Sequence, residues 1–282
     1  MWESKKIYAI ALDPVHIGAG GYRLGRVDNT IVRDPATNVP KIPGTSIAGV
    51  IRAFAEIVKD EDKEKNDTEK KLKNIDIKEI FGTDTKKGAL RFYDGQIIFF
   101  PVPSIQGTVW ITTKELLDYW FEEVEDQSGV KVEIPSNVEN KAIVIKGADI
   151  NNPLNLGWLL LEVERVGNGK EVTLPSEVGS WVRRSVVVSD KLFSHIVNDN
   201  LEVRTSVRID KDTGTAAEGA LFTYEAIPRG TVFGFEISLD KIRDSIRDNV
   251  IDTVMNAVKP YLRYLGIGGM GTRGFGRLEV LL

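Results

Sequence analysis

Gly-Ile-Gly-Gly-Met-Gly-Thr-Arg-Gly-Phe-Gly-Arg, residues 266–277, is a loop with six glycines among its first eleven residues. A helical pattern over Asp240–Leu265 precedes it, and a strand pattern over Gly274–Leu282 follows it. Such glycines expose backbone N–H groups and let a polyanion approach closely. They are interleaved with apolar and basic residues, whereas a flexible linker would interleave them with serine. The pattern therefore favours phosphate contact over a linker, through Gly268, Gly269, Gly271, Arg273, Gly274 and Arg277.

The rest of the chain alternates strand and helix patterns without regular βαβ spacing, which predicts an α+β protein. These pieces fit a ferredoxin-like (RRM-type) βαββαβ core with large insertions. Helix patterns cover Thr45–Val58, with Thr45 or Ser46 as a cap, and also Ile75–Phe81, 113–123 and Ser189–Asn200. Strand patterns cover Lys5–Leu12, Ala89–Pro101, Val109–Thr112, Ala142–Ala148, Leu156–Val166 and Thr231–Leu239. Alternation in Val203–Ile209 and Ala220–Ile227, around the turn Asp210–Gly214, predicts a β-hairpin.

Composition excludes several classes of protein. The 282 residues contain no cysteine, which excludes disulfides, thiolate metal sites and cysteine nucleophiles. They contain only two histidines, too few for a histidine-rich metal site. The longest apolar runs, such as Gln96–Val102, are too short to span a bilayer. The N-terminus leads directly into a strand pattern, unlike a signal peptide. We therefore expect a cytoplasmic protein with no membrane partner.

The total charge and the placement of charges lead to opposite expectations about RNA binding. The formal charge of −4 argues weakly against RNA binding, because cations supply much of the affinity for phosphate. Many of the acids, however, lie in the segments Lys59–Lys73 and Glu122–Asp126. The arginines cluster elsewhere, near residues 23–33, 183–184, 204–208 and 263–277. The placement of charge therefore argues weakly for RNA. Trp158 and Trp181 are expected to be packing residues.

The glycine-rich loop resembles the signature of the RAMP superfamily of CRISPR proteins. His16–Gly20, Arg26–Asp34 and Pro40–Arg52 resemble the N-terminal block of backbone subunits of type III complexes. The middle and later blocks resemble subunit four of the type III-B (Cmr) complex; they comprise Arg91–Asp94, Pro101–Gly107, Arg208–Gly214, Glu218–Phe222 and Glu225. The likeness runs along nearly the whole chain. It implies one domain over 1–282, a ferredoxin-like palm with a charged insertion at roughly 59–80 and a thumb-like β-hairpin at roughly 200–230.

The resemblance also implies a function. Copies of such a subunit stack in a helical filament along a CRISPR guide RNA, together with other Cmr subunits. Each copy inserts its hairpin into the guide–target duplex and cuts the target RNA, and the cuts fall at regular intervals. A divalent metal, Mg or Mn, is required, and the essential aspartate corresponds to Asp28. RNA contacts are expected at Arg26, Arg33, Ser46, Arg52 and Arg208.

Asp28 is the main candidate for the chemistry. Cleavage of RNA by its own 2′-hydroxyl needs in-line geometry, a proton acceptor and charge stabilisation at the phosphate. Flipping a nucleotide out of a duplex permits that geometry. Asp28 can act as base or as a metal ligand, and Arg26 and Arg33 can neutralise the phosphate. The alternative is a turn residue that satisfies local N–H groups, since Asp-Asn is a common turn pair.

Other candidates have two interpretations each. His16 either assists proton transfer or orders its loop and contacts RNA. Glu225 either joins the catalysis or is a cross-strand hairpin residue. At the position of a lysine in the family, this chain has Ala48, which cannot hold a phosphate; Arg52, one turn later, is its expected substitute. His195 is expected on the surface of a helix.

Three functions stay open on sequence. The first is an RNA-guided endoribonuclease subunit. The second is a non-catalytic guide-binding backbone subunit, or the equivalent subunit of a type III-A (Csm) complex. The third, from another class, is a small-molecule enzyme whose glycine loop binds nucleotide phosphates. Loss of target cleavage on substitution of Asp28 would distinguish the endoribonuclease from a scaffold subunit. RNA bound to the purified protein would distinguish both of these from a small-molecule enzyme.

Overall fold

The computed structural model describes residues 2–20, 27–60, 72–121, 125–126, 128–129, 131–135, 138–166, 171–209, 212, 214–241 and 249–281. Arg26, residues 61–71 of the charged insertion and the side chain of Arg208 lie outside this description. No helix in the described ranges is both long enough and apolar enough to cross a membrane.

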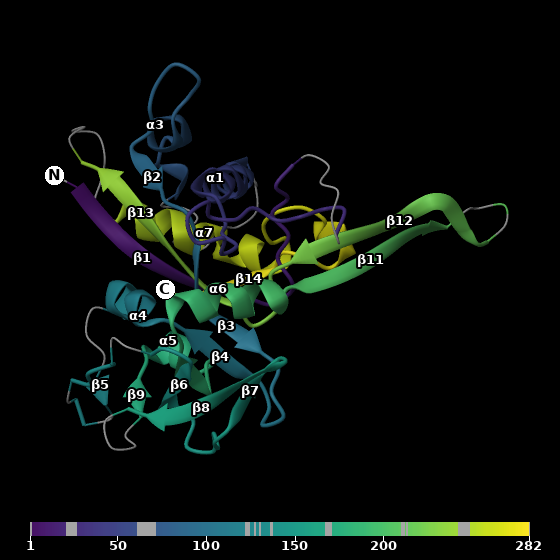
Figure 1. Ribbon diagram of the computed structural model, residues 1–282. Coiled ribbons are helices and arrows are strands. Elements are labelled where there is room, and N and C mark those ends of the chain that lie inside the picture. The colour runs from purple at the N-terminus through teal and green to yellow at the C-terminus, as the bar shows by residue number, and fades with distance from the viewer. Residues whose placement is uncertain are drawn as a thin grey trace.

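A ten-stranded sheet organises the molecule, with lateral order β14-β1-β13-β3-β4-β10-β6-β8-β7 and with β2 paired to β13 (Figure 1). Two further pairs, β5 with β9 and β11 with β12, form separate two-stranded sheets. The strands of the large sheet are β1 (Trp2–Ala11), β2 (Leu90–Phe92), β3 (Gln96–Val102), β4 (Val109–Thr112), β6 (Lys141–Lys146), β7 (Leu154–Leu156), β8 (Leu159–Arg165), β10 (Ser185–Val187), β13 (Val232–Asp240) and β14 (Leu278–Leu281). The α+β class expected from sequence is therefore confirmed.

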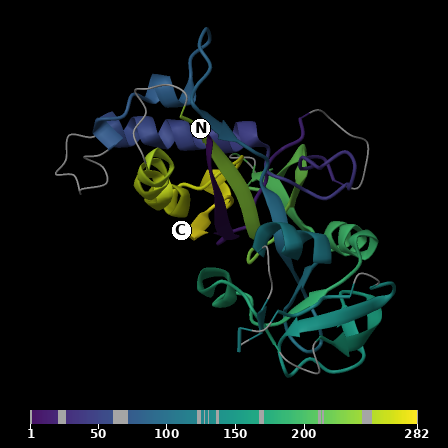
Figure 2. The ribbon, with the colours of Figure 1, turned by 90° about the vertical axis from the view of Figure 1, so that its left-hand side faces the viewer.

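Two helices cover one face of the first half of the sheet. They are α1 (Gly44–Asp60) and α7 (Val250–Tyr264), which pack against each other, as Figure 2 shows. Strand β1 explains how the two faces arise from alternation: Ile7 and Ala9 join the core under these helices, whereas Ile10 joins the core on the other face. The other core includes Leu117 and Trp120 of helix α4 (Lys114–Phe121).

Several predicted elements differ from the structure. A turn at residues 157–158 divides the strand pattern Leu156–Val166 between β7 and β8, and the pattern Gly274–Leu282 becomes a strand only at Leu278. Two more elements differ in extent. The strand pattern Ala89–Pro101 is divided into β2 and β3, because Gly95 leaves the ladder and exchanges backbone hydrogen bonds with Ile42 (2.7 and 2.9 Å). The helix pattern Asp240–Leu265 begins too early, because Asp240 is the last residue of β13 and pairs with Trp2. Both errors come from partners far away in the chain.

The second half of the sheet carries smaller helices, α5 (Ser176–Gly179) and α6 (Asp190–Asp199), and the pair β5 (Glu125–Asp126) and β9 (Val172–Thr173). Helix α6 begins as predicted, because the hydroxyl of Ser189 accepts a hydrogen bond from the Leu192 N–H. The short helix α3 (Ile77–Phe81) ends at Gly82, also as predicted.

The predicted hairpin is present and extends from the body of the molecule (Figure 1). It consists of β11 (Glu202–Ile209) and β12 (Ala216–Ala226), which are antiparallel and pair Thr205 with Thr223. Its base joins the body where Ile227 exchanges backbone hydrogen bonds with Val15 (2.8 and 2.9 Å). This junction is where most of the predicted site residues meet.

Candidate RNA-cleavage site

Four segments distant in sequence converge at the base of the hairpin. The loop that contains His16 is bridged to Ile227 of the hairpin base through Val15. The segment that contains Asp28 is bridged to the same strand through Asn29 and Tyr224. The glycine-rich loop joins them where the Gly269 N–H donates to the His16 carbonyl (3.0 Å). Strand β12 is thus the common support of the site.

Asp28 is held by one residue of that strand. Its Oδ2 accepts hydrogen bonds from the N–H and from the hydroxyl of Thr223, both at 2.8 Å. Its own N–H donates to the Thr223 hydroxyl oxygen at 2.9 Å. These hydrogen bonds to the ionised form, the backbone one first, lower the pKa of Asp28 below its usual range. The carboxylate is partly exposed, and no donor among the described residues reaches its Oδ1.

Glu225, two residues further along β12, is engaged by its neighbours. One carboxylate oxygen lies 2.5 Å from Nη2 of Arg33, and the other accepts the Ile31 N–H at 3.2 Å. Arg33 also donates to the Asn198 side chain (2.9 Å) and the Ile31 carbonyl (3.1 Å). The carboxylate partners of Glu225 thus lie in the segment 31–33, whereas its cross-strand neighbour on the hairpin is Val203. The same contacts leave little of the Arg33 guanidinium for an RNA phosphate.

His16 is buried, with 6% of its surface exposed. Its Nδ1 lies 2.6 Å from the Glu225 carbonyl oxygen, and its ring meets the Tyr224 ring edge-on with 5.9 Å between centroids. Because a carbonyl oxygen only accepts, Nδ1 is the donor of this hydrogen bond. These contacts support the role of His16 in ordering the loop.

Backbone packing explains three glycines of the glycine-rich loop. A Cβ added at Gly266 would lie 2.4 Å from the carbonyl carbon of Gly276. One added at Gly268 would lie 2.5 Å from the carbonyl oxygen of His16, and one added at Gly276 would lie 2.2 Å from the carbonyl oxygen of Ile267. All three have positive φ angles, so a side chain would be strained as well as blocked.

The same loop still offers donors to an anion. Gly269 and Gly276 donate their N–H groups to the carbonyls of His16 and Pro14. A second group of N–H donors has no protein acceptor among the described residues: Gly268, Met270, Gly271 and Thr272. These donors for the predicted phosphate contact lie in residues 268–272, of which all but Met270 are exposed.

The two arginines of this loop differ in their surroundings. Arg273 is exposed, donates to the Tyr224 hydroxyl at 3.1 Å and lies over that ring at 5.9 Å. Arg277 forms a two-pronged ion pair with Asp13, and the guanidinium lowers the pKa of the Asp13 carboxyl. A phosphate therefore meets a free positive charge at Arg273 and a neutralised one at Arg277.

Two predicted RNA contacts lie on another element. Ser46 and Arg52 are on α1, and Arg52 bonds to Glu56 (2.9 Å) and the Gly82 carbonyl (3.3 Å). The helix begins at Gly44, one residue before the predicted cap, and Asp94 accepts the Gly44 N–H at 2.8 Å. Lys41 lies 2.6 Å from the same carboxylate, so the middle-block residue Asp94 braces the start of α1.

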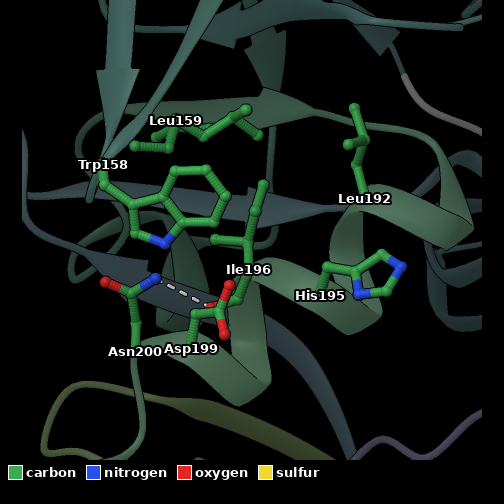
Figure 3. Close-up of a pocket in the computed structure, with 8 residues that line it drawn as sticks. Trp158, Leu159, Leu192, His195, Ile196, Asp199 and Asn200 are labelled. Atoms are coloured by element: carbon green, nitrogen blue, oxygen red, sulfur yellow. Dashed lines mark hydrogen bonds between the residues drawn. The ribbon is translucent and has the colours of Figure 1, made fainter.

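A separate apolar cavity of about 180 Å³ lies between the β7–β8 turn and α6 (Figure 3). Trp158 covers it from the turn with 78% of its surface exposed, so this indole lies at a surface cavity and not in the core. His195 points away from the indole and is exposed, as predicted. None of the residues gathered at the hairpin base lines this cavity. Its other lining side chains are mainly apolar: Leu156, Leu159, Leu192, Ile196, Asp199 and Asn200.

Sequence reasoning missed four contributors: Asp13, Arg204, Thr223 and Tyr224. Arg204 pairs with Glu202 and lies over the Phe275 ring at 4.7 Å, which fixes the hairpin base against the glycine-rich loop. Thr223 is on the same face of β12 as Glu225, two residues away, and this spacing was the available signal. The partners themselves lie too far apart in sequence to be found by pattern.

Known proteins resemble the whole of this chain. Its residues 9–279 match the family model of the RAMP superfamily. A relative from Pyrococcus furiosus named CRISPR system Cmr endoribonuclease Cmr4 is 31% identical, over 96% of this chain and 92% of the relative.

Solved structures share the fold. A cryo-EM structure of the type III-B Cmr-beta complex bound to cognate target RNA contains a chain with a TM-score of 0.70 and 22% identity, covering 99% of this chain and 96% of that one. The crystal structure of oligomeric Cmr4 from Pyrococcus furiosus matches with a TM-score of 0.64 and 22% sequence identity, and the match covers 99% of each chain. With the family match over residues 9–279, these likenesses lead to one conclusion: the chain belongs to the RAMP superfamily.

Proposed function

We propose that this chain is a repeating backbone subunit of a type III-B CRISPR effector complex, and that it binds guide RNA and cuts the paired target RNA. The observation that carries this proposal is the ionised Asp28 carboxylate at the base of a projecting hairpin, whose Oδ1 receives no hydrogen bond from the described residues. Its 31% identical relative is named a Cmr endoribonuclease. The structural neighbours include a Cmr complex on target RNA and an oligomeric Cmr4, which supports RNA, other Cmr subunits and further copies of itself as partners.

We further propose that the first half of the sheet is a ferredoxin-like palm. In support, the chain order is β1, α1, β2 with β3, β13, α7, β14, which corresponds to βαββαβ once the second half is treated as an insertion. The hairpin β11–β12 then corresponds to the thumb. Its exposed apolar residues Val203, Val207 and Leu221 suit contact with unstacked bases.

The chemistry proposed for the site is attack of a target 2′-hydroxyl on the adjacent phosphate. A duplex holds that backbone out of line, and insertion of the hairpin displaces a nucleotide and removes the restraint. The lowered pKa of Asp28 makes it a weak general base near neutral pH, but keeps it charged. Its free Oδ1 can therefore accept a hydrogen bond from the attacking hydroxyl and orient it. Arg273 and the free N–H groups of the glycine-rich loop can stabilise phosphate charge.

A divalent metal is part of this proposal, with Mg or Mn as the candidate. Among the described residues there is no group of three metal-ligating side chains. The residues fit a cation held by Asp28 Oδ1 and completed by RNA oxygens and water, which is a common way for proteins to hold Mg²⁺. Glu225 does not fit as a second ligand, because Arg33 and Ile31 occupy its oxygens. Such a metal would supply charge stabilisation at the phosphate.

The test is target cleavage by assembled ribonucleoprotein that carries Asp28→Asn. We expect loss of cleavage, with guide binding equal to that of the unaltered chain. Asp84→Asn, at an exposed turn, is the control and should cleave normally. Retained cleavage by Asp28→Asn would favour a scaffold subunit whose cuts are made elsewhere. Absence of bound RNA in the purified assembly would favour a small-molecule enzyme, and copurification with Csm subunits would assign the chain to type III-A.

A further inference from the structure

Thr223 of strand β12 is the residue that holds the Asp28 carboxylate by hydrogen bonds. We propose that Thr223 is the positioning residue of the site: it fixes the Asp28 carboxylate through Oδ2 and leaves Oδ1 to the substrate. The inference rests on the proposed role of Asp28 and adds a second residue to it. It also connects the reacting carboxylate directly to the element that enters the duplex.

Geometry shows why this carboxylate needs a holder. The terminal torsion of an aspartate side chain is soft, so an exposed carboxylate exchanges its two oxygens readily. Thr223 donates to Oδ2 from its N–H and from its hydroxyl, both at 2.8 Å, while the hydroxyl oxygen accepts the Asp28 N–H at 2.9 Å. Two donors on one oxygen, together with a return bond from the same residue, define the plane in which the carboxylate lies.

The backbone of this segment is held independently of the threonine hydroxyl. The Asn29 N–H donates to the Thr223 carbonyl at 3.0 Å, and the Glu225 N–H donates to the Asn29 carbonyl at 3.0 Å. The Ile31 N–H and Arg33 are anchored by the Glu225 carboxylate. Removal of the hydroxyl alone therefore keeps the segment and the backbone N–H bond to Oδ2, but removes the second donor and the return bond that fix the plane of the carboxylate. This separation makes the proposal testable.

Threonine is suited to this place by its chemistry. Its hydroxyl accepts one hydrogen bond and donates another at the same time. Valine has nearly the same shape but can do neither, and serine can do both.

The experiment compares Thr223→Val and Thr223→Ser in assembled ribonucleoprotein. The control is Thr173→Val, because Thr173 is an exposed strand residue of β9, which is not part of the hairpin. We expect Thr223→Val to reduce kcat by roughly 10- to 100-fold, as for a misplaced reactive group, with unchanged KM and guide affinity. Thr223→Ser should restore the rate, and Thr173→Val should match the unaltered chain.

Each other outcome overturns the inference. If Thr223→Val cleaves normally while Asp28→Asn does not, Thr223 does not position the carboxylate, although the proposed function stands. If Thr223→Val loses guide affinity, or if Thr223→Ser fails to restore the rate, the role of Thr223 is only structural. If Asp28→Asn itself still cleaves, the proposed function fails first. A further loss on adding Thr223→Val to Asp28→Asn would show that Thr223 acts through another group.

Discussion

Arg33 and Glu225, 192 residues apart in the chain, form an ion pair with 2.5 Å between Nη2 and Oε1. The pair is largely shielded, with 22% of the arginine and 12% of the glutamate side chain exposed. It binds the segment after Asp28 to the hairpin base. The two residues therefore stabilise the relative position of the elements that the proposed chemistry uses.

Glu225→Ala should lower the free energy of unfolding by about 1–3 kcal/mol, because it leaves the Arg33 guanidinium and the Ile31 N–H without their acceptor. Urea denaturation measures this. Glu164→Ala is the matched control, since its pair with Lys141 is exposed and should contribute less than about 1 kcal/mol. Equal losses in the two variants would show that the shielded pair has no special weight.

Gly276→Ala should destabilise the chain by at least about 2 kcal/mol, because its φ is +91° and an added Cβ would lie 2.2 Å from the Ile267 oxygen. Gly271→Ala in the same loop should change stability by less than about 0.5 kcal/mol, because its nearest neighbour would be 3.6 Å away. Thermal unfolding distinguishes the two. A stable Gly276→Ala chain would contradict the close backbone packing of this loop.

Arg273→Ala should weaken guide RNA binding more than Arg277→Ala, because Asp13 already neutralises Arg277. Binding measured over a series of salt concentrations tests this, and the Arg273→Ala slope of log affinity against log salt should fall by about one. Equal effects of the two substitutions would mean that the RNA displaces Asp13 from Arg277.

The ion pair at the start of α1 predicts a pH dependence. Lys41 and the Gly44 N–H lower the pKa of Asp94, so this carboxyl stabilises the fold above its unfolded pKa, about 3.9, and the contribution is lost as pH falls through the folded pKa. Asp94→Asn keeps an oxygen for the Gly44 N–H and removes the charge. We expect its Tm to lie below that of the unaltered chain at pH 7, and the difference to disappear as the pH falls through the folded pKa of Asp94, which lies below its unfolded value of about 3.9. A difference that persisted in acid would indicate that charge is not the cause.

Trp158→Ala should cost less than about 1 kcal/mol of stability, because the indole is 78% exposed. Trp120→Ala should cost about 3–5 kcal/mol, because that indole is 3% exposed and donates to the Gln96 side chain at 3.2 Å. Denaturant titration of both variants measures the contrast. A large loss in the first would place Trp158 in the core after all.

Local pattern predicted most elements of this fold. The alternation in β1, the Ser189 cap of α6 and the two strands of the hairpin all follow from neighbouring residues. Pattern failed where a distant partner decides the backbone. Gly95 leaves the strand because Ile42 pairs with it, and Asp240 stays in a strand because Trp2 pairs with it.

The site was less accessible to sequence. Family resemblance brought His16, Asp28, Glu225 and the glycine-rich loop forward, and the structure places all of them at the hairpin base. It did not reveal that Thr223, 195 residues from Asp28, holds the carboxylate. The pairing of Arg277 with Asp13, 264 residues away, was equally hidden. Side-chain partners across such separations are set by the folded topology.

The contacts of the hairpin with the body involve the last residues of β12, from Thr223 to Ala226, and the adjoining Ile227. Residues added or removed where β11 turns into β12 would alter how far the hairpin reaches while its root stays as it is. A shift of one residue within the root would instead turn Thr223 and Glu225 to the opposite side of the strand. The length of the hairpin at its turn and the contacts at its root can therefore change independently. Related chains can evolve hairpins of different length while the position of the Asp28 carboxylate stays the same.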